Sequence, residues 1–344
     1  MKIALVSTYV PFINGGARHI VEWLQAMLES RGHTVERVYL PEIDVPDLLF
    51  KQMMSFRWVD LESADRIICF RPQAHLIPHK HKILWFIHHL RSFYDLWDGP
   101  YRGFPDDLKH QEMREALQSV DTQALLEAKA IFTNSKVVSD RLKKYNNISS
   151  EVLYPPVFDS KRFHCATYSD EIVCICRLEH HKRQHLLVEA MHYVTTPVRL
   201  RLSGTSAGAE YPLALRQRIA ELELGGKITL ENRWITEEEK VEQLAQCLAA
   251  AYLPLDEDSY GYPSVEASHA SKPILTTSDS GGVLELVEHG INGYVSAPEP
   301  EALAALMDRL YLNRLETTTM GNNAVERLKL LNISWEHVLD RLLA

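Results

Sequence analysis

Residues 255–287, LDEDSYGYPSVEASHASKPILTTSDSGGVLELV, contain the pattern that decides the fold. Acidic residues and a Ser-Tyr-Gly-Tyr-Pro turn precede a helix-like run, VEASHAS, which Lys-Pro ends. The apolar ILTT then predicts a buried strand, and a Gly-Gly turn leads into a second helix-like run. Helix, strand and helix in this order are typical of an α/β protein.

Two carboxylates flank the first of these predicted helices. Asp258 precedes the helix and Glu266 lies in its first turns. Such residues can simply cap a helix N-terminus. They can also lie beside a site where free backbone N–H groups bind an anion, while the carboxylates accept hydrogen bonds from sugar hydroxyls. The residues alone leave both interpretations open.

The chain begins with the pattern of a βαβ unit. KIALVST is a strand-length apolar run, residues 19–33 have helical apolar spacing, and HTVERVYL predicts a second strand. Gly15 and Gly16 lie at the loop-to-helix junction, where glycine lets the backbone approach a ligand closely. Most Gly-Gly pairs only form a turn. The N-terminal residues are interpreted as a buried strand, not a signal peptide, because the apolar run is short and lacks a cleavage site.

Two further strands are predicted at residues 65–70 and 82–89. The second ends in His88 and His89. In α/β proteins functional residues concentrate at the carboxyl ends of strands. The simpler alternative for either histidine is a hydrogen-bonded side chain with a structural role.

The second half starts again with a predicted strand, EIVCICRL, after the proline-rich segment 151–163, which is interpreted as the linker between two domains. Arg177 ends this strand and Lys182 opens the next helical pattern. A cation at a helix N-terminus is unfavourable unless an anion lies there. A metal site formed by nearby Cys and His residues is not expected, because their spacing fits no standard set of ligands; they are Cys174, Cys176, His180, His181 and His185.

Composition limits the class of protein. The 344 residues include 46% hydrophobic and 24% charged residues, with a net charge of −9, which argues against nucleic-acid binding. Residues 1–160 hold 19 basic and 20 acidic side chains, whereas residues 161–344 hold 18 and 26. Any contact with an anionic membrane is therefore expected through the first half. Five cysteines without zinc-type spacing predict a reducing, cytoplasmic compartment.

The segment from Asp258 to Glu266 resembles the signature of the retaining GT-B glycosyltransferases of family 4, the glycosyl transferases group 1. Their motif has two acidic residues separated by seven others, followed by E-A-x-A-x-G-x-P. Here the first acid is Asp instead of Glu, and Ser271 replaces a Gly. Glu257 is one residue out of register and is the alternative for the first acidic position.

The resemblance extends over nearly the whole chain and implies two facing Rossmann-like domains with an interdomain cleft. The acceptor-side domain is expected at 1–160 and the nucleotide-sugar-binding domain at 161–330. A C-terminal helix at about 330–344 is expected to pack back on the first domain. The family string GRL…KG…LL.A appears as CRLEHHKRQHLLVEA, with Arg183 in place of the usual Gly.

Roles for single residues follow from the same resemblance. Arg177 and Lys182 are expected on the donor diphosphate, which would make a metal ion and any other cofactor unnecessary. Glu266 is expected to hold the ribose hydroxyls and Asp258 the hydroxyls of the transferred sugar. His88, with His89 as the alternative, is expected near the reaction centre.

Further donor-binding residues are assigned by resemblance: Gly15, Gly16, Trp234, Tyr260, Gly261 and Tyr262. Arg233 or Trp234 can stack on a nucleobase, although the residue pattern favours burial of Trp234 in the domain core.

The predicted function is therefore transfer of a sugar, with retention of configuration, from a nucleotide-diphosphate sugar to a saccharide or lipid-linked acceptor. The predicted location is the cytoplasm, with peripheral contact at the inner face of a membrane. Two alternatives remain: a GT-B nucleotide-sugar epimerase or phosphorylase, and a non-catalytic nucleotide-sugar-binding partner of a transferase. Fold resemblance alone does not separate them.

Overall fold

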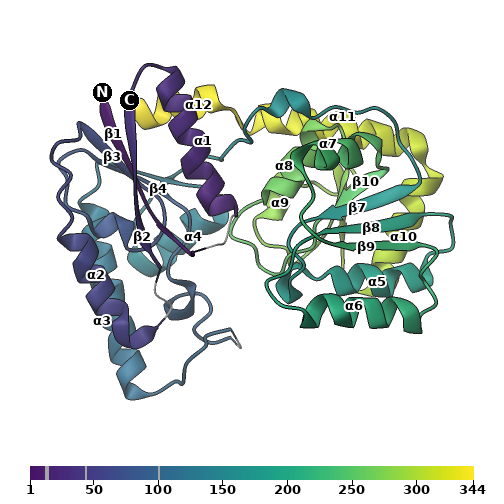
Figure 1. Ribbon diagram of the computed structural model, residues 1–344, viewed down its shortest axis with the longest axis horizontal. Coiled ribbons are helices and arrows are strands. Elements are labelled where there is room, and N and C mark those ends of the chain that lie inside the picture. The colour runs from purple at the N-terminus through teal and green to yellow at the C-terminus, as the bar shows by residue number, and fades with distance from the viewer. Residues whose placement is uncertain (12–14, 43–44, 100) are drawn as a thin grey trace. The chain divides into compact units, whose positions relative to one another are not determined.

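The computed structural model describes residues 1–11, 15–42, 45–99 and 101–344. The chain forms two compact units, which are described separately (Figure 1). The first unit comprises Met1–Pro155 and Ile333–Ala344, and the second unit comprises Pro156–Asn332. The sequence predicted the divisions at about residues 160 and 330.

The first unit is built on a parallel six-stranded sheet with the order β2-β1-β3-β4-β5-β6. Its strands are β1 (Lys2–Tyr9), β2 (Thr34–Pro41), β3 (Arg66–Cys69), β4 (Lys82–Phe86), β5 (Ala130–Thr133) and β6 (Glu151–Val152). Its α-helices are α1 (Gly16–Ser30), α2 (Leu49–Arg57), α3 (Leu108–Leu126), α4 (Lys136–Asn146) and α12 (Trp335–Leu343). Short 3₁₀ turns are η1 (Pro46–Leu48), η2 (Ala74–Leu76) and η3 (Arg91–Phe93).

Alternating residues of β1 form two different cores in the first unit. Ile3 and Leu5 pack with α1 and α12 on one face, whereas Ala4 and Val6 pack with α2, α3 and α4 on the other. Strands that are buried on both faces give continuous apolar runs, which explains the sequence of β1. The C-terminal helix α12 is therefore part of the first unit, and Trp335 lies edge-on to Trp85 of β4.

The second unit repeats this architecture with the strand order β12-β11-β10-β7-β8-β9. Its strands are β7 (Glu171–Ile175), β8 (Arg199–Gly204), β9 (Ile228–Asn232), β10 (Ala249–Ala251), β11 (Ile274–Thr277) and β12 (Gly293–Ser296). Its α-helices are α5 (Gln184–Tyr193), α6 (Glu210–Glu221), α7 (Glu237–Gln246), α8 (Tyr262–His269), α9 (Val283–Leu286), α10 (Pro300–Leu312) and α11 (Arg314–Leu330), with 3₁₀ turns η4 (Ser160–Arg162) and η5 (His180–Lys182). The predicted α/β class is confirmed.

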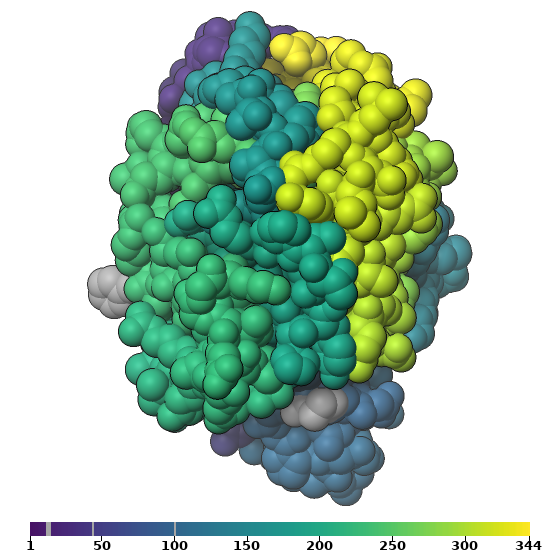
Figure 2. Space-filling model, turned by 90° about the vertical axis from the view of Figure 1, so that its right-hand side faces the viewer, coloured from purple at the N-terminus to yellow at the C-terminus, as the bar shows by residue number. Residues whose placement is uncertain are grey.

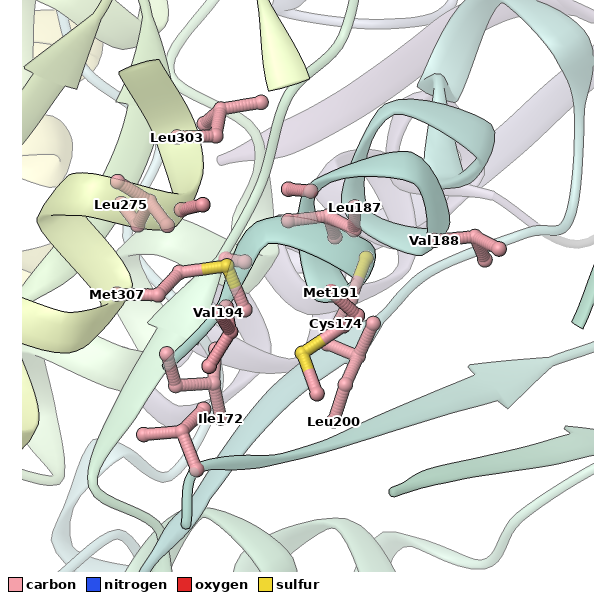
Figure 3. Close-up of a cluster of buried hydrophobic side chains, with 14 of the residues drawn as sticks. Ile172, Cys174, Leu187, Val188, Met191, Val194, Leu200, Leu275, Leu303 and Met307 are labelled. Carbon is pink, nitrogen blue, oxygen red and sulfur yellow. The ribbon is translucent and has the colours of Figure 1, made fainter. Parts of the chain in front are cut away.

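One face of the second sheet forms the largest core of this unit. Ile172 and Cys174 of β7 pack against α5 and α10 through side chains such as Leu187 and Met307 (Figure 3). Helices α5 and α10 lie side by side over this face, and Figure 2 shows the outer surface of this unit. The opposite face carries α7 and α8.

Helix starts follow the sequence signals. Ser135 caps α4 by accepting a hydrogen bond from the Val138 N–H at 3.1 Å, as the Asn-Ser pair before this helix predicts. Thr236 and Glu239 form a reciprocal capping box at the start of α7. In the described part of the chain, no helix is both long and apolar enough to cross a membrane.

Candidate functional site

The strand order of the second unit changes direction between β7 and β10. From β7 the chain proceeds to β8 and β9 on one side, and then returns to place β10 on the other side of β7. In open parallel sheets, ligands bind at the carboxyl ends of the strands at such a switch point. The loop after β7 carries Arg177 and Lys182, and the loop after β10 leads into α8. The structure therefore brings the predicted cations and the acidic segment to one edge of one sheet.

Lys182 is the centre of a cluster that joins these two loops. Its Nζ donates to the Tyr252 hydroxyl at 2.9 Å and forms an ion pair with the Glu257 carboxylate. The Tyr252 hydroxyl also donates to Glu257 Oε2 at 3.0 Å. Gly261, at the start of α8, packs directly on the Tyr252 ring. Lys182, Tyr252, Glu257 and Gly261 are called the Lys182 cluster below.

The sequence left open whether Asp258 or Glu257 fills the first acidic position. In the structure, Glu257 is the carboxylate that pairs with Lys182. Burial raises the pKa of the Glu257 carboxyl, but the Lys182 ammonium and the Tyr252 hydroxyl outweigh burial and hold that pKa below its usual value. The carboxylate is thus ionised at neutral pH. Asp258 is partly exposed beside it.

Gly261 is required by the backbone as well as by packing. Its φ of +67° is in the left-handed region, and a Cβ there would overlap the Tyr252 ring. The following Pro263 lies in the first turn of α8, where a missing N–H costs nothing. The predicted Gly-Tyr-Pro turn therefore starts α8 directly against the Lys182 cluster.

We expect Gly261→Ala to destabilise the second unit by about 2–4 kcal/mol, because left-handed strain and overpacking add. Gly290→Ala is a matched control, since Gly290 has a φ of +75° but open space around it. The control should be destabilised only by the backbone strain, which costs about 1–2 kcal/mol. Urea unfolding of both variants measures the difference. Equal losses would show that the Tyr252 contact does not restrict position 261.

Arg177 follows β7 and is exposed. Gly204 of β8 packs tightly against the backbone that precedes Arg177, because a Cβ at Gly204 would overlap the carbonyl of Cys176. Among the described residues, none forms a hydrogen bond or ion pair with the Arg177 guanidinium. The side chain is therefore a cation without a charged partner among the described residues, at the carboxyl edge of the sheet. Burial and Lys182 lower the pKa of His181 most, and Arg177 lowers it further.

Arg183, the residue that replaces the family glycine, has a φ of +54°, which explains why glycine is usual there. Its guanidinium forms a bidentate pair with Asp279, with both distances 2.7 Å, and it also donates to Thr277 Oγ1 at 2.7 Å. Further bonds go to the carbonyls of Leu253 and Pro254. The added charge is thus neutralised and ties the start of α5 to the ends of β10 and β11.

Glu266 is buried in α8, with 5% of its surface exposed. Its Oε1 accepts a hydrogen bond from Lys240 Nζ of α7 at 2.6 Å. Burial raises the pKa of the Glu266 carboxyl, and Lys240 opposes that rise. The carboxyl group borders a small cavity with Pro263 and with apolar side chains of β7, β10 and α7.

The aromatic residues assigned by resemblance have different environments. The expected burial of Trp234 is wrong: the side chain follows β9 in a loop and is 64% exposed. The α7 capping box begins at Thr236, so Trp234 lies in a short loop between β9 and α7. Arg233 pairs with Glu239 and Glu231 instead of an aromatic ring. Tyr260 is buried in the core, and Tyr262 is partly exposed at the start of α8.

In the first unit, His88 and His89 have distinct roles. His89 is buried: its Nε2 hydrogen-bonds Asn146 Oδ1 at 2.8 Å and its ring lies 4.2 Å from that of Tyr94. His88 is partly exposed, and its Nδ1 donates to the His89 carbonyl at 2.7 Å. Burial, and then Arg71, lowers the pKa of His88 to about 4. His88 is therefore neutral at physiological pH, with Nε2 as an acceptor.

Gly15 caps α1 with extended backbone, and the N–H groups of Arg18 and His19 donate to its carbonyl. A Cβ at Gly15 would meet no atom within 4 Å, so packing does not require glycine there. Gly16 is the first residue of α1. The preceding residues 12–14 lie outside the described part of the chain.

Sequence reasoning missed Tyr252, Lys240 and the ion pair of Arg71 with Glu42. Tyr252 immediately follows β10, and its position at a strand end was an available signal. Lys240 gave no signal, because a lysine on an amphipathic helix is usually exposed. The described residues contain no group of three or more His, Cys, Asp and Glu side chains that could hold a metal ion.

Comparison with known proteins defines the class. Residues 161–327 match the family model described as glycosyl transferases group 1. This match assigns the second unit to the group 1 glycosyltransferases, and the two parallel six-stranded sheets give the chain the GT-B fold. The chain is thus an enzyme that transfers sugars.

Relatives and solved structures agree with this assignment. The chain is 23% identical over 300 residues to the human alpha-1,3/1,6-mannosyltransferase ALG2, covering 78% of this chain and 69% of that protein. The Dictyostelium discoideum protein of the same name is 26% identical over 211 residues, 55% of this chain and 48% of its own length. The fold matches Anabaena Alr3699/HepE in complex with UDP (TM-score 0.70, 18% identity, 99% of both chains) and sucrose-phosphate synthase from Thermosynechococcus elongatus (TM-score 0.77, 16% identity, 98% and 97%).

Proposed function

We propose that this glycosyltransferase moves a sugar from a nucleotide-diphosphate sugar to a saccharide or lipid-linked acceptor, with retention of configuration and without a metal ion. The observation that carries the proposal is the placement of Arg177 and the Lys182 cluster at the switch point of the second sheet. Two cations and the N-terminus of α8 there face the place where an anionic ligand binds in such folds.

The departing diphosphate gains negative charge as the bond to the sugar breaks. Arg177 and Lys182 would stabilise that charge, which is the largest contribution such a site can make. Lys182 is already paired with Glu257, so Arg177 supplies the larger share of uncompensated positive charge. The backbone N–H group of Tyr262, at the start of α8, would add to it. These groups would take the place of a divalent cation.

The remaining residues would orient the two substrates. Glu266 would accept hydrogen bonds from the donor ribose, and Asp258 or Glu257 from the transferred sugar. Neutral His88 can accept or relay a proton through Nε2. With the donor diphosphate as base, the acceptor hydroxyl would attack from the face that the diphosphate leaves, which retains the configuration.

The relatives named as mannosyltransferases support mannose as the first sugar to test, and the UDP complex of HepE supports a parallel series of uridine donors. A cytoplasmic location, with peripheral contact of the first unit at a membrane, belongs to the same proposal.

The test is an assay of sugar transfer by the purified protein, with and without EDTA. The donors are GDP-mannose and UDP-hexoses, and the acceptors are simple mannosides and lipid-linked saccharides. We expect acceptor-dependent transfer, an NMR spectrum showing the donor's anomeric configuration in the product, and no effect of EDTA. An inverted product would contradict retention, and loss of activity in EDTA would contradict metal independence. Product formed without an acceptor would indicate an epimerase, and dependence on inorganic phosphate a phosphorylase.

A further inference from the structure

Glu266 has a cationic partner that no sequence motif indicates. Lys240, on the neighbouring helix α7, donates to Glu266 Oε1 at 2.6 Å, and both side chains are largely buried, at 14% and 6% exposure. Ion pairs of this kind are rarely retained for stability alone, because desolvation offsets most of the attraction. The effect of Lys240 on the position and charge of the Glu266 carboxyl group is therefore the more informative property of this pair.

Lys240 is itself held in place by a chain of charges. Its Nζ lies 3.0 Å from Glu237 Oε2, and Glu237 also accepts from Arg162 at 2.5 Å. The Arg162 guanidinium in turn lies over the Phe163 ring, 4.9 Å from its centroid. Among the described residues, the charged groups that act on Glu266 are Lys240, Glu237 and Arg162, and the hydroxyl of Tyr262 is a further titratable group beside it. A lysine fixed on several sides defines both the position and the direction of the bond that it donates.

The protonation state of Glu266 decides what it can bind. An ionised carboxylate accepts hydrogen bonds from two neighbouring hydroxyls, whereas a protonated one donates a proton and accepts less. Burial pushes Glu266 toward the protonated form, and Lys240 is the group that opposes this with both a charge and a hydrogen bond. Only Oε1 is bonded to Lys240, which leaves Oε2 for another donor.

We infer that Lys240 is a positioning residue for the donor site, which holds the Glu266 carboxylate through Oε1 and directs it to the ribose hydroxyls of the nucleotide. The inference rests on the proposed function, because it assumes that Glu266 binds the ribose. It adds a residue from α7 to a site whose other groups lie on loops after β7 and β10 and on α8.

The experiment measures dissociation constants of UDP and GDP for the full chain by calorimetry between pH 6 and pH 8.5. For the better-bound nucleotide, Lys240→Met should weaken binding at pH 6 by about tenfold, the value of a hydrogen bond to a charged group. Without Lys240 the raised pKa of Glu266 leaves the carboxyl protonated at low pH. The loss of affinity relative to wild type should therefore shrink as the pH rises. Ionisation of the terminal phosphate, with a pKa of about 6, affects both proteins alike and cancels in this ratio.

Two comparisons separate positioning from a merely structural role. With the matching 2′,3′-dideoxynucleoside diphosphate, which lacks both hydroxyls, wild type and Lys240→Met should bind equally. In a Glu266→Gln background, Lys240→Met should have no further effect. Lys240→Arg should restore most of the binding. Lys329→Met is the control for removing a lysine, since Lys329 pairs with Glu326 on the surface of α11.

The outcomes distinguish the inference from the proposed function. If Glu266→Gln binds UDP and GDP like wild type, the ribose role of Glu266 in the proposed function is wrong. If Glu266→Gln weakens binding but Lys240→Met does not, only the inference is overturned. Equal losses for the nucleotide and its dideoxy analogue, or parallel pH profiles, would also overturn it, because they would place Lys240 on the diphosphate or in the scaffold.

Discussion

Replacing Arg177 by alanine is expected to lower kcat by about 10²-fold or more without lowering the melting temperature. The guanidinium is exposed at the carboxyl edge of the second sheet and forms no hydrogen bond or ion pair with another described residue, so its removal breaks no such native interaction. Its expected contribution is made to the developing charge of the diphosphate in the transition state, where loss of one such group typically costs this much. Initial-rate kinetics and thermal unfolding of the same preparation measure both effects.

Arg199 provides the matched control. It is also exposed, but it begins β8 and therefore lies at the opposite edge of the same sheet. Arg199→Ala should leave kcat unchanged. Arg177→Lys should recover part of the activity, because a lysine keeps the charge and loses the forked geometry. A rate for Arg177→Ala within about twofold of wild type would remove this residue from the site.

Lys182→Ala is a poorer test of whether these cations stabilise the charge that develops on the diphosphate. Truncation would leave the largely buried Glu257 carboxylate without its ammonium partner, so loss of activity and loss of stability would occur together. Lys182→Met keeps most of the packing against the Tyr252 ring but also leaves Glu257 unpaired, so the preferable variant combines it with Glu257→Gln, which removes the unpaired charge.

Arg183→Ala is expected to destabilise the second unit by about 2–4 kcal/mol, because it removes several hydrogen bonds donated by a largely buried guanidinium, whereas the Asp279 side chain that it leaves unpaired is 38% exposed. The guanidinium donates to a carboxylate, a hydroxyl and two backbone carbonyls, and alanine satisfies none of them. Alanine also remains strained at a φ of +54°. Urea unfolding, monitored by tryptophan fluorescence and circular dichroism, measures the loss.

Two variants separate the contributions. Arg183→Gly should be less destabilising than Arg183→Ala by about 1 kcal/mol, because glycine removes the backbone strain. Combining Arg183→Ala with Asp279→Ala should be less harmful than the sum of the two single changes, since neither charge is then left unpaired. Strict additivity would show that Arg183 and Asp279 are not energetically coupled. A loss below about 1 kcal/mol for Arg183→Ala would show that the network as a whole does not stabilise this unit.

Much of the fold follows from local sequence patterns. The apolar run of β1, the helical spacing of α1 and the Ser135 cap of α4 each specify one element, because propensity, periodicity and capping agree there. The sequence showed that Arg183 replaces the family glycine, and the structure shows that the backbone is left-handed at this position. The partners of Arg183, in contrast, come from residues about 70 and 96 positions later.

The candidate site was less predictable for a physical reason. A motif indicates which segment carries acidic groups, but a one-residue difference between Asp258 and Glu257 depends on the turn geometry of the loop. The choice between His88 and His89 likewise depends on which ring the Asn146 amide holds in the core. The exposure of Trp234 depends on whether another layer covers its loop, which no local pattern records. Lys240 and Glu266 are brought together only by the packing of α7 and α8.

The central claim is that the second unit binds the diphosphate of a nucleotide sugar through Arg177. Thermal shift with UDP, GDP, ADP and their common sugars tests it most directly. A ligand present at a hundredfold excess over its Kd stabilises the native state by about 2.7 kcal/mol. We predict that nucleotides of one base raise the melting temperature of the wild type clearly and that of Arg177→Ala much less. If no nucleotide raises the wild-type melting temperature, or if both proteins shift equally, the claim is contradicted.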